Sequence, residues 1–240
     1  MHSGIWAFTA PARGLVPALM LGLLISPAAW SAERLWFAGV ETSPDNSYAY
    51  TGLLMPAFGG NLGEGFVQRY WLDRVSYRYD SDNRTIEAEA PGVEAALGYA
   101  SPTSRGSVTG LLGILYRDTR LRPDDPDSAA RGGQWRIKAQ VESTQQLTGA
   151  LELGLTGSYI FGQQGYWARV RLGRAFGNGR RAGPELVFQG DPDYQVTQAG
   201  VFLTGLEITP TVQAGLKAGI RNQRNKASRG YFGVEISALF

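Results

Sequence analysis

The chain ends in Gly230-Tyr231-Phe232-Gly233-Val234-Glu235-Ile236-Ser237-Ala238-Leu239-Phe240. Every second side chain from Phe232 to Phe240 is apolar, whereas Glu235 and Ser237 fall on the other face, and this is the period of a β-strand. In a soluble domain an apolar strand at the end of the chain would be an exposed, aggregation-prone edge. A closed barrel in a membrane pairs that edge and gives its apolar face to lipid.

The last residue, Phe240, supports the same interpretation. A terminal strand that ends in phenylalanine resembles the tail signal by which bacterial outer-membrane barrels are recognised for assembly. We therefore expect Phe240 to act in assembly and the closing strand to pair with residues 211–221 on one side and 35–41 on the other. Glu235 would then face the lumen near Lys217.

Residues 1–31 have the three-part layout of a secretory signal peptide. One cation, Arg13, precedes an apolar run over residues 15–25, and small residues follow. The run is too short for a transmembrane helix. Cleavage after Ala28 or after Ser31 would satisfy the small-x-small rule equally well. We expect residues 32–240 to form a single exported domain.

The composition excludes several classes of function. The chain has 23 Lys and Arg against 21 Asp and Glu, so the basic excess that nucleic-acid binding normally requires is absent. It has no cysteine, and its single histidine is His2, within the signal segment. Serine and cysteine hydrolases that depend on histidine and most zinc sites are therefore excluded. We expect no enzyme, no cofactor, no metal and no nucleic-acid partner.

The mature segment divides into about twelve stretches with at least partial alternation, separated by turn-forming residues. The predicted strands are 35–41, 48–55, 66–79, 85–99, 107–116, 135–142, 149–161, 166–174, 184–189, 194–208, 211–221 and 230–240. The sequence thus predicts an all-β fold, an antiparallel up-and-down transmembrane β-barrel of about 12 strands in the bacterial outer membrane. A soluble exported all-β protein is the alternative.

The stretch 85–99 changes phase in its middle. Ile86, Ala88 and Ala90 form an apolar face before Pro91-Gly92, and residues of the opposite parity, from Val93 to Tyr99, form one afterwards. A one-residue slip at Pro-Gly is typical of a bulge. With that bulge, Glu87 and Glu89 would face the lumen.

The connections that we assign to the outside of the cell have aromatic neighbours, which predicts a belt at the membrane surface. Its members would be Tyr48, Tyr50, Tyr77, Tyr79, Tyr116, Trp135, Tyr159, Phe161, Tyr166, Phe188, Tyr194 and Tyr231.

Charged residues and two tryptophans alternate onto the predicted lumen face. The candidates for binding a glycan there are Trp71, Trp167, Arg69, Asp73, Glu87, Glu89, Arg136, Lys138, Arg169, Arg171, Lys217 and Glu235. Indole rings beside charged groups are typical of sugar-binding channels, because a pyranose stacks on a ring while its hydroxyls bind polar partners. The alternative is an interior closed by mutual ion pairs and packed rings.

The external connections are rich in aspartate, with Asp124, Asp125 and Asp127 in one and Asp191 and Asp193 in another. Clustered carboxylates could bind calcium or bridge to lipopolysaccharide through divalent cations. Tight turns require the same residue types, and the spacing matches no calcium-binding loop. We keep these residues as candidates for contacts at the cell surface.

Several stretches resemble one known family. They are Phe37-Ala38-Gly39-Val40-Glu41 with Ser43-Pro44-Asp45 and Tyr48-Ala49-Tyr50, Glu94-Ala95-Ala96-Leu97-Gly98-Tyr99, Tyr116-Arg117-Asp118-Thr119, Pro123-Asp124-Asp125-Pro126, Tyr166-Trp167-Ala168-Arg169, Gly183-Pro184-Glu185 and Gln189-Gly190-Asp191-Pro192. Together they are similar to the cellulose biosynthesis protein BcsS family of Gram-negative bacteria. The resemblance covers the mature chain and implies a role in cellulose production, but it supplies no catalytic residues.

Three functions remain open from the sequence. The first is a non-enzymatic outer-membrane barrel in cellulose or other exopolysaccharide secretion, in which the glucan passes through the lumen or docks at the surface. Its partners would be outer-membrane lipid or lipopolysaccharide, a β-glucan and other cellulose-secretion proteins. The second is a small porin for oligosaccharides or other solutes, unrelated to cellulose, and the third is a purely structural barrel.

Overall fold

The fold is seen in a computed structural model, which describes residues 33–81, 84–177, 179–192, 194–224 and 226–240. The predicted signal segment, residues 1–31, lies outside this part of the chain. The strands are β1 (Leu35–Ser43), β2 (Asn46–Pro56), β3 (Gly65–Ser81), β4 (Arg84–Thr103), β5 (Gly106–Arg122), β6 (Gly132–Gln146), β7 (Leu151–Ile160), β8 (Gly165–Ala175), β9 (Arg181–Gly190), β10 (Gln195–Thr209), β11 (Val212–Gln223) and β12 (Arg229–Leu239). Within the described residues no helix is long and apolar enough to cross a membrane.

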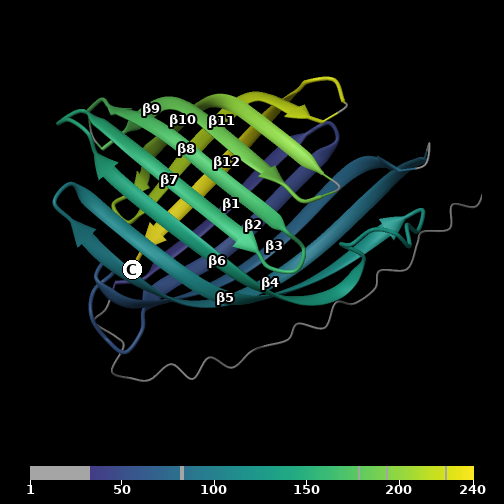
Figure 1. The fold of residues 1–240 in the computed structure, drawn as a ribbon. Coiled ribbons are helices and arrows are strands. Elements are labelled where there is room, and N and C mark those ends of the chain that lie inside the picture. Colours follow the sequence, from purple (N-terminus) through teal and green to yellow (C-terminus); the bar gives the residue numbers. More distant parts are fainter. Residues whose placement is uncertain (1–32, 82–83, 178, 193, 225) are drawn as a thin grey trace, which may run out of the picture. The chain divides into compact units, whose positions relative to one another are not determined.

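The twelve strands form a closed antiparallel barrel, in which each strand pairs with its neighbours in sequence and β1 pairs with β12. The predicted fold class and the predicted closing pair are therefore confirmed. Figure 1 shows β12 lying between β11 and β1. At the seam, the Arg34 amide donates to the Phe240 carbonyl at 2.6 Å and the Phe240 amide donates to the Arg34 carbonyl at 3.0 Å.

Because the strand number is even, the described ends of the chain lie at the same end of the barrel. We call this end periplasmic and the other end external, in the orientation assigned from the sequence. The external end carries the connection between β5 and β6, residues 123–131. The connection between β2 and β3, residues 57–64, lies at the periplasmic end.

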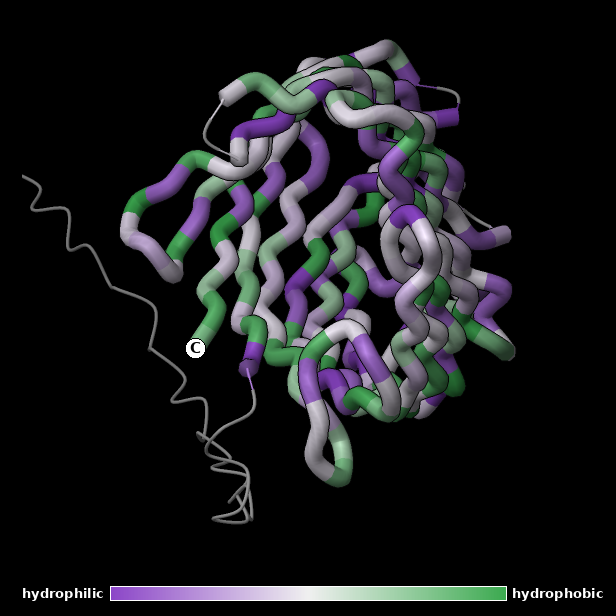
Figure 2. Tube along the Cα trace, turned by 90° about the vertical axis from the view of Figure 1, so that its left-hand side faces the viewer, coloured by the Kyte–Doolittle hydropathy of each residue, from purple (hydrophilic) through white to green (hydrophobic). Residues whose placement is uncertain are grey.

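The side chains alternate between the lumen and the outside of the barrel. Figure 2 shows hydrophilic and hydrophobic residues alternating along neighbouring strands. Large apolar side chains are exposed on the outer surface, among them Leu72, Val93, Leu97, Leu112, Ile114, Ile137, Val141, Leu155, Leu186, Val201, Leu216, Ile220 and Phe232. An apolar exterior around a polar lumen is the pattern of an outer-membrane barrel.

The predicted bulge in β4 is wrong. Arg74 pairs with Pro91 and Asp73 pairs with Gly92, in the same register as the pairs on either side. The register shifts that the structure shows lie in β10, after Leu203 and after Glu207.

Glu87 and Glu89 consequently do not face the lumen. They point outward and pair with arginines of β3, Glu87 with Arg78 at 2.9 Å and Glu89 with Arg74 at 2.8 Å, and their side chains are 59% and 44% exposed. The opposite face of the same strand is buried, with Ile86 fully enclosed. It packs against aromatic and aliphatic side chains of β3 and β5, namely Tyr77, Tyr79 and Leu121.

The error has a physical cause. Outward residues of β3 to β5 are mainly apolar up to Leu72, Val93 and Tyr116 and mainly charged beyond them, so this part of the wall rises out of the lipid into water. Where water replaces lipid outside, the charged side chains face out and the apolar ones face in. The hydrophobic pattern changes phase although the backbone does not.

The predicted aromatic belt is wrong for half of its members. Trp135, Tyr159, Phe161, Tyr166 and Phe188 are exposed on the outer surface, and Tyr116 packs on Trp135 at a ring distance of 4.9 Å. In contrast, Tyr48, Tyr50, Tyr77, Tyr79, Tyr194 and Tyr231 point inward. Closeness to a loop in the sequence indicates depth in the membrane but does not indicate which face of the strand a residue occupies.

Candidate functional site

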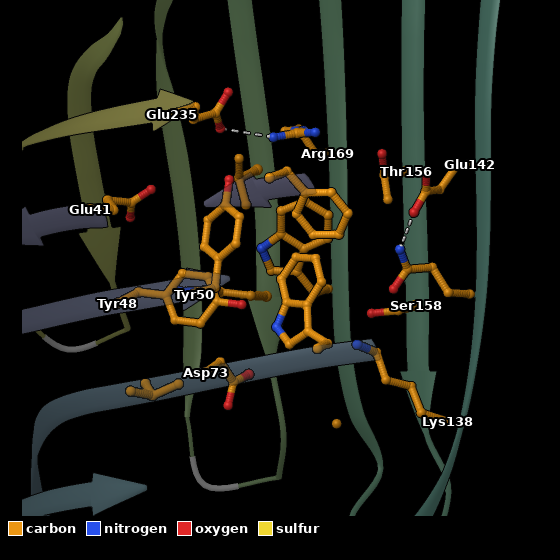
Figure 3. A pocket seen from close by; sticks show the side chains of 18 of the residues that line it. Glu41, Tyr48, Tyr50, Asp73, Lys138, Glu142, Thr156, Ser158, Arg169 and Glu235 are labelled. Carbon is orange, nitrogen blue, oxygen red and sulfur yellow. Dashed lines mark hydrogen bonds and ion pairs between the residues drawn. The ribbon is translucent and has the colours of Figure 1, made fainter. Parts of the chain in front are cut away.

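The lumen encloses a cavity of about 480 Å³ whose lining comes from strands all around the barrel. Figure 3 shows labelled side chains converging on it, including Tyr48 and Tyr50 on one side and Glu142 and Lys138 on the other. Its lining combines aromatic rings with charged side chains.

Three rings form an aromatic platform, which we define as Phe37 of β1, Tyr50 of β2 and Trp71 of β3. Tyr50 stacks on Trp71 with ring centroids 4.8 Å apart and planes 7° apart, and Phe37 lies 5.1 Å from Trp71. Tyr48 continues the row on β2, 5.4 Å from Tyr50. All four residues line the cavity.

Two glycines let the rings of the platform lie against the barrel wall. A Cβ atom on Gly39 would come within 2.7 Å of the Tyr50 ring, and one on Gly52 would come within 2.3 Å of Phe37. Each ring therefore covers a glycine on the neighbouring strand, where any side chain would push it away. This arrangement holds the rings to the wall and leaves cavity beside them.

Trp167 of β8 lines the cavity from the opposite wall, because β8 is six strands from β2 in either direction around the barrel. The guanidinium carbon of Arg169 lies 5.4 Å from the centre of the Trp167 ring. On the platform side, Arg69 and Lys138 lie 5.4 and 5.9 Å from the Trp71 ring. Aromatic surfaces flanked by cations thus face the cavity from both sides.

The wall from β3 to β6 carries the first cluster of ion pairs. Arg69 contacts Glu94 at 2.5 Å and Glu142 at 3.0 Å, and Lys138 contacts Glu94 at 2.8 Å. The side chains of Arg69 and Glu94 are only 3% and 2% exposed. Arg117 binds both carboxylate oxygens of Asp73, at 2.6 and 2.8 Å.

The second cluster connects β8, β9, β11, β12 and β1. Glu235 binds Arg171 at 2.9 Å and Arg169 at 3.2 Å, and the predicted proximity to Lys217 is confirmed at 3.8 Å. Figure 3 shows Glu235 and Arg169 pointing toward one another. Arg171 also pairs with Glu185, and Lys217 pairs with Glu41 at 2.6 Å.

Each of the two clusters is balanced in charge, with three cations and three carboxylates. The cations are Arg69, Arg117, Lys138, Arg169, Arg171 and Lys217, and the carboxylates are Glu41, Asp73, Glu94, Glu142, Glu185 and Glu235. Each of these six cations is paired with at least one of these six carboxylates. The central lumen therefore has no net charge from these groups.

Two further lumen arginines lie nearer the external rim. Arg136 donates to the Gln134 side chain and to the Trp135 carbonyl, and it is not among the residues that line the cavity. Arg221 is buried, with its guanidinium carbon 5.8 Å from the centre of the Tyr194 ring.

The external loop of residues 123–131 uses two of its carboxylates internally. Asp124 forms two hydrogen bonds with Arg131, at 2.6 and 2.7 Å, and the buried Asp125 accepts one from Tyr79 at 2.8 Å. Asp127 is exposed.

The other acidic loop lies between β9 and β10. Asp191 accepts a hydrogen bond from the Tyr194 amide at 2.9 Å, and Asp193 lies outside the described residues. No group of three or more His, Cys, Asp or Glu side chains in the described ranges could hold a metal ion.

Of the candidates predicted from the sequence, eight line the cavity: Trp71, Trp167, Arg69, Asp73, Lys138, Arg169, Lys217 and Glu235. Arg171 contacts Glu235 but is not among the residues that line the cavity, Arg136 lies nearer the rim, and Glu87 and Glu89 lie outside the barrel.

The sequence prediction missed Phe37, Glu41, Tyr48, Tyr50, Arg117 and Glu185. The signal for two of them is the first hairpin, in which Glu41 pairs with Tyr48 and Gly39 with Tyr50. Because residues paired across two strands share a face, an inward Glu41 implies an inward Tyr48.

Outer-membrane channels are among the solved structures with a similar fold. The KdgM porin, alone and in complex with disordered oligogalacturonate, has a TM-score of 0.54 and 12% identity, covering 85% of this chain and 98% of the porin. The COG4313 outer membrane channel from Pseudomonas putida F1 has a TM-score of 0.52 and 11% identity, covering 87% and 94% of the two chains. At these identities the likeness shows the fold.

No curated protein sequence is similar enough to this chain to count as a relative. The model of one family, described as "Cellulose biosynthesis protein BcsS", matches residues 35–240, which include all twelve strands of the barrel. The chain is an outer-membrane β-barrel associated with cellulose biosynthesis and belongs to the BcsS family.

Proposed function

We propose that this barrel binds a neutral β-glucan of the cellulose type in its lumen and lets it pass the outer membrane, without chemical change to the polymer. The observation that carries the proposal is the aromatic platform, whose rings lie against the wall and line the cavity opposite Trp167. A pyranose ring presents apolar C–H faces that stack on aromatic rings, as apolar surface leaves water.

The paired charges supply the polar half of such a site. Hydroxyl groups of a sugar donate to carboxylates and accept from guanidinium and ammonium groups, and both kinds line the cavity at fixed positions. Since each charge already has a counterion, a neutral ligand can bind without leaving a charge unpaired. A barrel of the same fold, the KdgM porin, was solved with an oligogalacturonate, which supports a saccharide as the ligand class.

The structure gives less support to docking at the external loops. In the loop of residues 123–131, Asp124 forms an ion pair with Arg131 and Asp125 accepts a hydrogen bond from Tyr79. Two of its three carboxylates therefore already have partners within the protein. The absence of enzymatic activity is also part of the proposal. Glu87 and Glu89, two carboxylates on one face of β4, lie outside the lumen, in ion pairs with arginines.

The test is conductance of the purified barrel in planar bilayers, with cello-oligosaccharides added as blockers. We expect wild-type current to be blocked, and we expect Trp71→Ala and Trp167→Ala each to weaken the block about tenfold, as loss of a stacking ring costs about 1–3 kcal/mol. Trp135→Ala is the matched control, because that ring is 68% exposed on the outer surface. Unchanged block in both lumen variants would refute the proposal. Binding without conductance would favour docking over passage.

A further inference from the structure

Glu235 contacts three cations in the lumen. Its carboxylate, 18% exposed and on the cavity surface, contacts Arg171 at 2.9 Å, Arg169 at 3.2 Å and Lys217 at 3.8 Å. Three strands separate β12 from β8, which carries both arginines, so these contacts reach across the lumen. One carboxylate therefore neutralises cations from two parts of the wall.

The three cations depend on Glu235 to different degrees. Arg171 also has Glu185, and Lys217 also has Glu41 at 2.6 Å. For Arg169 the ion pair that the structure shows is the one with Glu235. Without the Glu235 charge, Arg169 would present an uncompensated guanidinium to the cavity, beside the Trp167 ring at 5.4 Å.

A guanidinium beside an indole is a good binding site for an acidic sugar. The planar fork of arginine binds carboxylates through two parallel hydrogen bonds, while the indole stacks on the pyranose. In the native barrel Glu235 already occupies the arginines and places a negative charge where a uronate carboxylate would bind. Glu235 thus competes with an acidic ligand for the cations, and its negative charge repels that ligand.

We infer that Glu235 is a specificity-determining residue, which excludes anionic saccharides from the lumen and restricts it to neutral ones. This inference rests on the proposed function, and it assigns the choice between neutral and acidic polymers to one carboxylate.

The experiment compares wild type with Glu235→Gln by calorimetric titration of the full-length purified barrel in detergent. The probes are cellohexaose, which is neutral, and hexagalacturonate, which is acidic. We expect the variant to bind hexagalacturonate about tenfold or more tightly than wild type, since it frees a charge-assisted hydrogen-bonding site. Affinity for cellohexaose should not rise with it, because the ring faces remain while one charged hydrogen-bond acceptor is lost. The measured quantity is therefore the ratio of the two affinities.

Two further variants separate this effect from damage to the fold. Glu89→Gln removes a carboxylate from the outer surface and should leave both affinities unchanged. Glu235→Gln combined with Arg169→Gln removes both partners, so it should lose the gain for hexagalacturonate. If Glu235→Gln does not fold, Arg169→Gln alone still tests the inference, because it leaves an excess of negative charge and should weaken hexagalacturonate binding further.

The possible results distinguish the two proposals. A folded Glu235→Gln barrel that still rejects hexagalacturonate overturns the role of Glu235 and leaves the saccharide channel standing. Wild-type barrel that binds both probes equally also overturns it. If wild type does not bind cellohexaose, the proposed function fails, and a gain of hexagalacturonate binding in the variant would still support the role of Glu235.

Discussion

The substitution Glu94→Gln should destabilise the barrel much more than Glu89→Gln, although the two residues lie on the same strand. Glu94 is 2% exposed and pairs with Arg69 at 2.5 Å and Lys138 at 2.8 Å. Its removal leaves Arg69 with Glu142 but takes from Lys138 the carboxylate that it contacts. Stranding a buried charge costs about 3–5 kcal/mol, and we expect the lower end because Arg69 keeps one partner. Glu89 forms an exposed pair with Arg74, for which about 0–1 kcal/mol is expected.

The assay is equilibrium unfolding in urea of barrels folded into phospholipid vesicles, followed by tryptophan fluorescence and by gel mobility. The double variant Glu94→Gln with Lys138→Met should recover part of the loss, because it also removes the stranded charge. Equal losses for Glu94→Gln and Glu89→Gln would refute the continuous register of β4 and the division of its two faces.

Three further predictions test other parts of the structure. Gly52→Ala would place a methyl group 2.3 Å from the Phe37 ring, so it should cost about 1–3 kcal/mol in the same unfolding assay; an unchanged midpoint would show that the ring does not lie over the glycine. Tyr79→Phe removes the 2.8 Å hydrogen bond to Asp125, which should cost about 1 kcal/mol and make tryptic cleavage of the external loop about fivefold faster. Unchanged cleavage would show that this hydrogen bond does not hold the loop to the barrel wall. Deleting Phe240 removes its two backbone hydrogen bonds with Arg34 at the end of the seam and should lower the amount of assembled barrel in outer-membrane fractions. Normal assembly would contradict a role for this residue in closure.

Most of the fold was predictable because two signals are local. Alternation in strands such as β6, β8 and β11 depends on neighbouring residues alone, and turn-forming residues mark where each strand ends. These signals give the number of strands and the closing pair of β12 and β1.

The faces of β4 were not predictable from alternation, because the hydrophobic pattern also depends on the medium outside the barrel. Ile86 and Val93 are both apolar, but Ile86 faces inward in the part of the wall that stands in water, and Val93 faces lipid. A register slip and a change of medium leave the same trace in the sequence. Only the pairing of Asp73 with Gly92 and its neighbours separates them.

The sequence predicts several of the residues that line the candidate site, but it does not predict which ion pairs they form. Trp71, Arg69 and Asp73 share one parity on a single strand, which places them on one face. The contacts of Arg69 with Glu142 and of Glu235 with Arg169 join strands that are three or more positions apart around the barrel. Such pairs depend on the curvature and tilt of the closed sheet, which no short stretch of sequence encodes.

The central claim is that the lumen of this barrel carries a cellulose-type glucan across the outer membrane. The most direct measurement is the amount of cellulose at the surface of a deletion strain complemented with wild type, Trp71→Ala or Trp135→Ala, with barrel levels matched in outer-membrane fractions. We predict that surface cellulose falls in the deletion strain, returns with wild type and with Trp135→Ala, and stays low with Trp71→Ala. Normal surface cellulose in the deletion strain would contradict the claim.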